Sequence, residues 1–250
     1  MSSIRRQRRR KRILKGILIT AAVLAAVVLI GFVLMKKVFV IREMDVEGCV
    51  YAQEEEVLAA VQSGDYSENS ILLFLQLMFG EQPDAAFVDT VRVSFVSPWQ
   101  VTLNVTEVTV YGFVYDEDTG IYTYFDADGT VNAISATAVP DTMEVDGTVS
   151  GDATKGSELS LIPAGSLDYV LEVFSLISSY DLNVYIVHLD TRGNVYFTTS
   201  GITIQLGTDG NTAEKFENLS AILPQLEGKT GTLDLSVFEE TGDDIIFTEE

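Results

Sequence analysis

One long apolar segment stands out near the N-terminus of the chain. Residues 16–35 (GILITAAVLAAVVLIGFVLM) carry no charge over 20 positions. At about 1.5 Å per residue, a helix of this length crosses a hydrocarbon core of about 30 Å. The pattern predicts a membrane helix over residues 16–37, preceded by a basic tail over residues 1–15. A secretory signal peptide is the alternative, although its apolar region spans only about 7–15 residues.

The next segment, residues 38–110, carries the pattern of a small domain. Alternating apolar residues predict an extended strand that ends at Gly48. The three glutamates at 54–56 then begin a helix, because acidic residues in a first turn complement the helix dipole. This helix would carry apolar residues on one face only, which is typical of a helix packed on a sheet.

An apolar run, SILLFLQLMF at residues 70–79, predicts a second and largely buried helix. Ten residues are too few to cross a bilayer, and Asn69 or Ser70 is a suitable cap. Two stretches with a period of two, residues 91–95 and 101–105, predict a hairpin. The predicted order of elements is therefore strand, helix, helix, strand, strand.

A β domain is predicted over residues 111–238. Aromatic-rich segments separated by Asp/Gly turns, such as DADG at 126–129, indicate short antiparallel strands. Residues 132–160 are rich in Ser, Thr, Gly and Asp, and this composition predicts a loop. Apolar residues at helical spacing begin at Leu167, and three alternating runs then predict a meander.

The last part of the chain predicts one more helix and one more strand. Asn211 with Glu214 three residues later forms a capping pair for a helix that stops at Gly228. An alternating run at residues 233–237 predicts the last strand, and residues 239–250 form an acidic tail. The predicted fold class is α+β, with a single transmembrane helix before two small domains.

The charges are segregated along the chain. Ten of the 16 Lys and Arg residues precede Val38, whereas all 37 Asp and Glu residues follow it. The chain after Val38 is so acidic that it excludes a surface for binding nucleic acid. Basic residues are more numerous before the apolar segment than just after it, so the positive-inside bias places the N-terminus in the cytoplasm and the rest outside. The run RRQRRRKR also fits a nuclear localisation or RNA-binding arm.

Residues with catalytic or metal-binding chemistry are few. One cysteine, Cys49, and one histidine, His188, do not suffice for an internal disulfide or a zinc site of the usual ligands. No G-x-S-x-G accompanies His188, which favours a structural histidine over a Ser/His/Asp hydrolase. Asp126 and Asp128 form half of a calcium loop, but Ser135 stands where the closing glutamate belongs, so we expect a plain turn. We predict no catalytic, cofactor-binding or metal-binding residues.

Several of these segments, taken in order, resemble the FtsQ/DivIB family of bacterial cell-division proteins. The resemblance runs nearly end to end, and no single motif carries it alone. After the basic tail and apolar segment, the matching segments are FVIREMDVEG at 39–48, VRVSFVSPWQVTLNVTE at 91–107, YFDADG at 124–129, Val139-Pro140, QLG at 205–207, Lys215 and LDL at 233–235. The chain departs from the family pattern where Val108 follows Glu107 in place of arginine, and where Ala52 replaces a helix-capping hydroxyl.

The resemblance implies a single-pass protein with an external POTRA domain over residues 38–110 and a β domain after it, located at the division septum. Its implied role is a non-enzymatic scaffold of the septal cell-wall synthesis complex. The implied partners are the FtsL-like and DivIC/FtsB-like single-pass division proteins.

Strand addition at an exposed sheet edge is the contact chemistry that we expect for such partners. The resemblance puts this edge near the end of the β domain. Mapped onto this chain, the candidate partner-binding residues are Thr232, Leu233, Leu235, Val237 and Phe238. The competing interpretation is that the apolar residues among them face the core. Two other functions remain open, an extracellular cell-wall-modifying enzyme and a POTRA-bearing export or assembly factor.

Overall fold

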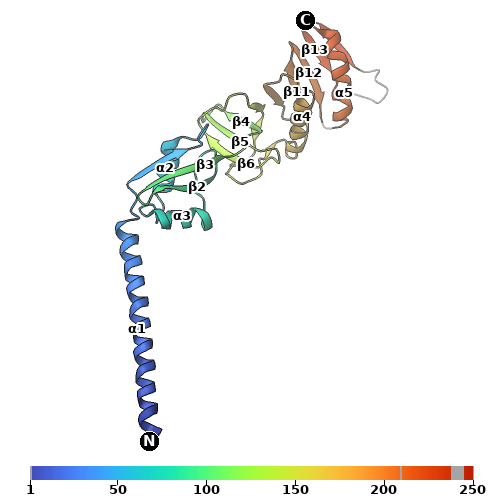
Figure 1. Ribbon diagram of the computed structural model, residues 1–250. Helices are drawn as coiled ribbons and strands as arrows, with labels where there is room; N and C mark the ends of the chain where they lie inside the picture. The colour runs from blue at the N-terminus through green and yellow to red at the C-terminus, as the bar shows by residue number, and fades with distance from the viewer. Residues whose placement is uncertain (1, 209, 238–244, 250) are drawn as a thin grey trace. The chain divides into compact units, whose positions relative to one another are not determined.

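The computed structural model describes residues 2–208, 210–237 and 245–249. The chain is mixed α+β and divides into two compact units, Met1–Glu107 and Val108–Glu250 (Figure 1). The division lies close to the boundary predicted at residue 110. Each unit is described on its own below.

The first unit begins with one long helix, α1 (Ser2–Lys37). This helix runs through the predicted basic tail without a break into the apolar segment. Its section Lys15–Lys37 has a mean hydropathy of 3.0, and none of that section is buried. By length and composition this section can cross a membrane, and a signal sequence has the same properties.

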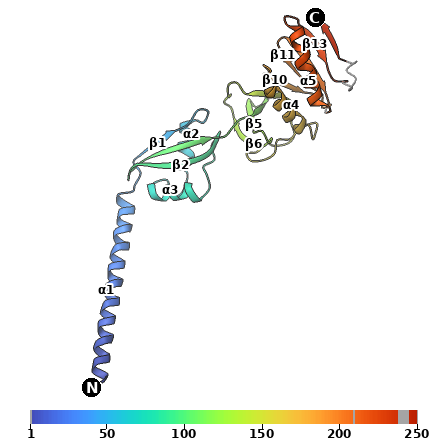
Figure 2. The same cartoon turned by 45° about the vertical axis from the view of Figure 1, so that its right-hand side comes forward.

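The rest of the first unit has two helices and a three-stranded sheet. Its elements are β1 (Glu43–Glu47), α2 (Glu54–Gln62), α3 (Ser70–Phe79), β2 (Val88–Ser97) and β3 (Gln100–Glu107). The sheet order is β1-β3-β2, with β1 parallel to β3 and β2 antiparallel to it. Figure 2 shows the three strands side by side, with α3 beside β2. The predicted order of elements is confirmed.

Apolar side chains from both helices bury the inner face of this sheet. Those of the helices are Val57, Val61, Leu73 and Leu77, and those of the sheet include Val91, Val101 and Leu103. The predicted cap of α3 is also confirmed, since the Asn69 carboxamide oxygen accepts hydrogen bonds from the backbone N–H of Ile71 (3.1 Å) and Leu72 (3.2 Å).

The second unit is built on a mixed nine-stranded sheet with the order β14-β13-β12-β11-β10-β7-β4-β5-β6. The strands are β4 (Gly112–Asp116), β5 (Ile121–Phe125), β6 (Val131–Ser135), β7 (Met143–Asp146), β10 (Ile186–Leu189), β11 (Val195–Thr199), β12 (Ile202–Gly207), β13 (Gly231–Asp234) and β14 (Ile246–Glu249). Three neighbouring pairs are parallel, namely β4–β7, β7–β10 and β12–β13. A separate ribbon pairs β8 (Thr148–Val149) with β9 (Leu161–Ile162).

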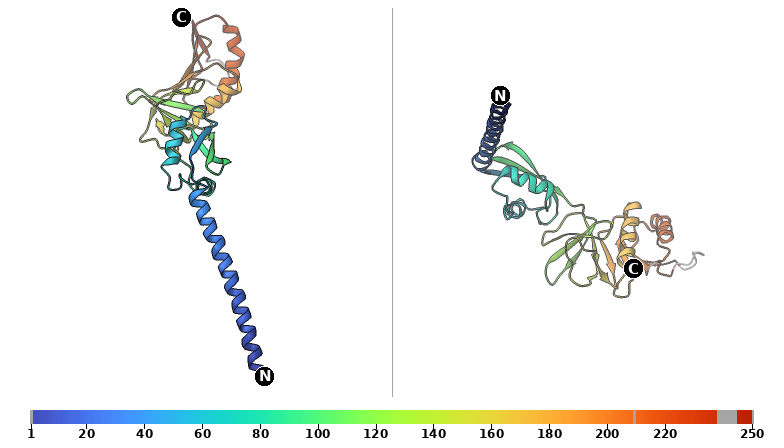
Figure 3. Two further views of the ribbon diagram at one scale, coloured as in Figure 1. Left: turned by 60° about the vertical axis from the view of Figure 1, so that its left-hand side comes forward. Right: turned by 90° about the horizontal axis from the view of Figure 1, so that it is seen from below.

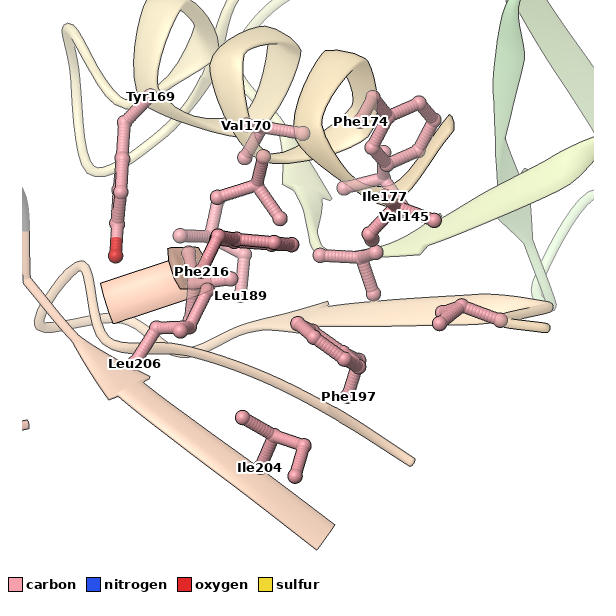
Figure 4. Packing of buried hydrophobic residues seen from close by; sticks show 14 of the residues in the cluster. Val145, Tyr169, Val170, Phe174, Ile177, Leu189, Phe197, Ile204, Leu206 and Phe216 are labelled. Atoms are coloured by element: carbon pink, nitrogen blue, oxygen red, sulfur yellow. The ribbon is translucent and has the colours of Figure 1, made fainter. Parts of the chain in front are cut away.

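Two helices cover one side of this sheet, α4 (Leu167–Ser179) and α5 (Thr212–Ile222), and the short 3₁₀ helix η1 (Leu223–Leu226) follows α5 (Figure 3). Figure 4 shows Val170, Phe174 and Ile177 of α4 directed toward the strands, where they meet residues such as Val145 and Phe197. All five side chains are at most 2% exposed, and they form the centre of the core.

The prediction of mostly loop over residues 132–160 missed the strands β7 and β8 and most of β6, which lie in this range. Strand β7 is an interior strand, paired in parallel with β4 and with β10. Its sequence, MEVD, contributes one fully buried side chain, Val145. A strand this short shows no visible period, and its position depends on partners that are distant in the sequence.

The capping pair predicted at Asn211 is also wrong. Asn211 has a left-handed backbone (φ 53°), and its side chain makes no cap hydrogen bond. Its carbonyl oxygen instead accepts the first helical bond, from the backbone N–H of Lys215 (2.9 Å).

Candidate interaction edge of the second unit

The predicted partner-binding residues Thr232 and Leu233 lie on β13, which is an interior strand. On one side β13 pairs in parallel with β12, and on the other it pairs antiparallel with β14. The prediction that this strand forms the edge is therefore wrong. The reason is that part of the predicted acidic tail forms β14, in which Phe247 is half-buried and packs against the core, whereas its neighbours Ile246 and Thr248 are exposed.

The remaining predicted residues also have different environments. Leu233 and Leu235 are each 1% exposed and belong to the core cluster, as the competing interpretation holds. The backbone N–H of Leu235 donates to the carbonyl oxygen of Gln205 (2.9 Å), so it is not free for a partner. Val237 is 67% exposed, and Phe238 lies outside the described residues.

The observed edge of the sheet at this end is β14. Among the described residues, no strand pairs with the side of β14 that faces away from β13. The side chain of Ile246 is 61% exposed, and Thr248 is also exposed. A strand edge with unpaired N–H and C=O groups and alternating side chains can accept an extended partner.

Lys229 supports this edge from the turn that precedes β13. Its ammonium lies 5.8 Å from the ring centroid of Phe247, and it forms an ion pair with Glu249 at 3.7 Å. Both contacts join β14 to the body of the unit. Both contacts are partly exposed, so each stabilises the folded unit modestly, on the order of 0.5–1 kcal/mol.

A glycine at the start of β13 allows β14 to approach. Gly231 has φ 152°, and a Cβ at this position would lie 2.2 Å from the carbonyl oxygen of Thr248 and 3.0 Å from the Cα of Glu249. Any other residue at position 231 would force the two strands apart. A glycine at the start of an apolar strand is the sequence signal for such a close backbone approach.

A buried lysine fixes the neighbouring strand. Lys215 of α5 is 3% exposed, and its ammonium donates to the carbonyl oxygen of Leu206 (2.7 Å) at the end of β12. A second, longer bond goes to the carbonyl oxygen of Thr208 (3.5 Å). This residue belongs to the family resemblance. In this fold it joins α5 to β12, the strand that pairs with β13.

His188 lies away from this edge, and its partner is not the neighbouring Asp190. Its Nδ1 lies 2.6 Å from Oδ2 of Asp146, and its ring stacks on Tyr196 with centroids 4.5 Å apart and planes 9° apart. Asp190 instead accepts bonds from the backbone N–H of Arg192 and Asn194 within its own turn. The histidine thus joins three adjacent strands, β7, β10 and β11, which is a structural role.

Glu144 is on the same face as this pair. Burial raises the pKa of the Glu144 carboxyl above its ordinary value, and the nearby negative charge of Asp146 raises it further, whereas His188 lowers it.

No metal centre is formed within the described residues, since no three His, Cys, Asp or Glu side chains are grouped to hold an ion. The turn expected at Asp126 is confirmed. Its Oδ1 accepts from the backbone N–H of Asp128 (3.0 Å) and Thr130 (2.9 Å). These bonds are typical of an Asx turn.

In the first unit, Glu107 organises the loop between β1 and α2. Its Oε1 accepts hydrogen bonds from the backbone N–H of Val50 (2.8 Å), Tyr51 (2.9 Å) and Ala52 (2.7 Å). These three N–H groups precede α2, whose N-cap Gln53 makes no side-chain cap hydrogen bond, so Glu107 holds the loop and does not cap the helix. Half-buried Cys49 lies nearby, and burial together with the charge of Glu107 raises the pKa of its thiol, which disfavours the reactive thiolate.

No family model matches this chain, and neither does any curated protein. The resemblance found in the sequence stays a prediction, and the case for function depends on the geometry described above.

Proposed function

We propose that this chain is a single-pass membrane protein that acts as a non-enzymatic scaffold in bacterial cell division. In this proposal α1 crosses the membrane, and the two α+β units are exported and bind other single-pass chains. The observation that supports it best is the exposed edge strand β14 at one end of the nine-stranded sheet.

The order of elements in the first unit supports its assignment as a POTRA domain. A strand, two helices and a hairpin follow one another, and the first strand lies parallel to the last. The proposed topology has the N-terminus in the cytoplasm, because eight Lys and Arg residues precede the apolar segment and all acidic residues follow it.

In the proposed contact, an extended segment of a partner pairs with β14 and continues the sheet. The partner would be an FtsL-like or DivIC/FtsB-like division protein, anchored in the same membrane. Because both chains are tethered, even a weak contact gains from a raised effective concentration. The exposed side chains of Ile246 and Thr248 would then select the partner segment.

The test is a proline scan of β14 in the full-length chain. Along a strand, successive N–H groups point alternately toward one neighbour and the other. Of Thr248→Pro and Glu249→Pro, one variant therefore removes an N–H from the free side and the other removes one directed at β13. We expect the variant that loses the N–H on the free side to lose co-purification with the division proteins without a change in thermal unfolding.

Localisation provides the second arm of the test. A fluorescent protein fused to the N-terminus of the native chain should form a band at the division plane, and the binding-deficient proline variant should not. A uniform envelope signal from the native chain would contradict the scaffold role. Unchanged co-purification by both proline variants would contradict the edge mechanism alone.

A further inference from the structure

The first unit carries a group of exposed apolar side chains on one end. Val40, Tyr66, Phe95, Val96 and Trp99 are all exposed, from 37% for Val40 to 62% for Val96. We name these five residues the exit patch. Contiguous apolar patches on a soluble surface mark contact sites for another apolar phase.

Hydrogen bonds fix the exit patch beside the end of α1. The carboxamide of Asn69 donates to the carbonyl oxygen of Met35 (2.7 Å), the last residue of the charge-free segment. Asn69 also forms a bridge with Val40. The loop before α3 is therefore held at the level where the apolar helix ends.

The tip of the β2–β3 hairpin is held at the same level. The backbone N–H of Arg42 donates to the carbonyl oxygen of Trp99 (2.8 Å), and the Ser70 hydroxyl donates to that of Pro98 (2.7 Å). Arg42 is only a few residues past the end of α1 at Lys37. The hairpin tip thus lies close to the point where the chain leaves the apolar helix.

The geometry of the hairpin exposes its apolar residues. The register shifts between Phe95 and Ser97, so the strand bulges at Val96. Trp99 occupies the turn. Tyr66 lies in the loop before α3, where it lines an open cleft of about 630 Å³ together with Val40 of the same patch and Phe32 and Met35 of α1.

We infer that the exit patch lies in the interface of the bilayer that α1 crosses, with Trp99 and Tyr66 at the level of the lipid headgroups. Trp and Tyr are enriched at this level because their rings are apolar and their N–H and O–H groups are polar. Three cations at the end of α1, Lys36, Lys37 and Arg42, favour anionic headgroups there.

This contact would set the height of the first unit above the membrane. Asp65 and Glu68 line the same cleft as Tyr66, and anionic lipid repels these carboxylates, so the apolar patch and the three cations must outweigh them to turn this end toward the bilayer. The inference rests on the proposal that α1 spans a membrane. It does not depend on the division role or on the partner edge.

The experiment uses the fact that Trp99 is the sole tryptophan of the chain. The full chain is reconstituted in vesicles of phosphatidylcholine and phosphatidylglycerol, with or without lipid brominated in its acyl chains. Interfacial residues enter the headgroup and acyl boundary by about 5–10 Å, so we expect brominated lipid to reduce Trp99 emission to roughly half or less. Vesicle flotation verifies that the chain is inserted.

The matched control moves the reporter to the other end of the same unit. In the double variant Trp99→Phe/Tyr51→Trp the tryptophan lies beside Glu107, at the far end of β3 from the hairpin tip. Eight residues of strand separate the two ends by roughly 23 Å. Its emission should stay unquenched. The variant Val96→Ser should weaken quenching of Trp99 and leave thermal unfolding unchanged, because this side chain is 62% exposed.

Two outcomes would overturn the inference. If the chain floats with the vesicles and Trp99 is not quenched more than the Tyr51→Trp reporter, the patch does not touch lipid, although α1 still spans. If the chain does not float, the span itself is wrong, and the membrane part of the proposed function is lost as well.

Discussion

A Cβ atom at Gly231 would lie 2.2 Å from the carbonyl oxygen of Thr248. No real side chain tolerates this separation, so the residue at position 231 decides whether β14 can pair with β13. Because β14 forms the proposed partner edge, one glycine in the body of the unit controls a surface formed by the last residues of the chain.

Replacing this glycine should release β14. In Gly231→Ala the two strands must separate, and we expect a loss of about 1–3 kcal/mol of unfolding free energy together with faster hydrogen exchange at residues 246–249. Gly120→Ala is the matched control. Gly120 also has a positive φ (71°), but nothing lies within 4 Å of its added Cβ. Equal exchange at β14 in the two variants would show that the close approach is not needed.

Glu107 should be the most important carboxylate of the first unit. Glu107→Ala removes the acceptor of three backbone N–H groups, those of residues 50, 51 and 52. We expect a cost of about 1–3 kcal/mol in the unfolding free energy, since bonds to a charged acceptor are stronger than neutral ones. Chemical denaturation measures it, with Glu47→Ala on the exposed side of β1 as the control. A loss no larger than that of the control would show that the loop closes without this carboxylate.

Glu144 should make the stability of the second unit depend on pH. Burial and the charge of Asp146 raise the pKa of its carboxyl in the folded state. The folded state therefore binds this proton more tightly than the unfolded state, and stability falls as the pH rises from the ordinary glutamate value of 4.5 through the raised value.

The substitution Glu144→Gln removes this titration. We expect the variant to be more stable than the native chain at pH 7. The gain in unfolding free energy should be less than about 1 kcal/mol, because the group is partly exposed and water screens it. The difference should disappear below pH 4.5. A variant that is less stable at neutral pH would contradict the assigned cause, and Glu172→Gln on the exposed side of α4 is the control.

The sequence predicted best the elements that depend on local signals. The helix at 70–79 follows from an apolar run and one capping side chain, Asn69, and the hairpin after it follows from a period of two around Pro98. The strands β7 and β14 were missed because their pairing partners are far away in the sequence. Val145 pairs with Val187, and Phe247 with Leu233; neither short segment shows a period of its own.

The candidate site was missed for the same reason. An alternating run such as LDLSV predicts a strand, but its position in the sheet depends on which other segment pairs beside it. In the fold β14 takes that position, and Leu233 and Leu235 are core residues. Two sequence signals could have indicated this, the glycine at position 231 and the apolar residues at 245–247 within an acidic tail.

The hydroxyl of Tyr124 should stabilise the segment that leads from β6 to β7. Tyr124 is fully buried, and its hydroxyl donates to the carbonyl oxygen of Thr137 (2.7 Å) and accepts from the backbone N–H of Val139 (2.9 Å). Burial raises the pKa of this phenol, so it stays a donor through the physiological range. Tyr124→Phe keeps the ring and removes both bonds, which should cost about 1–3 kcal/mol. Tyr122→Phe is the matched control, because its ring stacks on Tyr124 but is only half-buried. Chemical denaturation measures both losses, and a loss for Tyr124→Phe no larger than that for Tyr122→Phe would show that the two hydrogen bonds of the Tyr124 hydroxyl do not hold this segment in place.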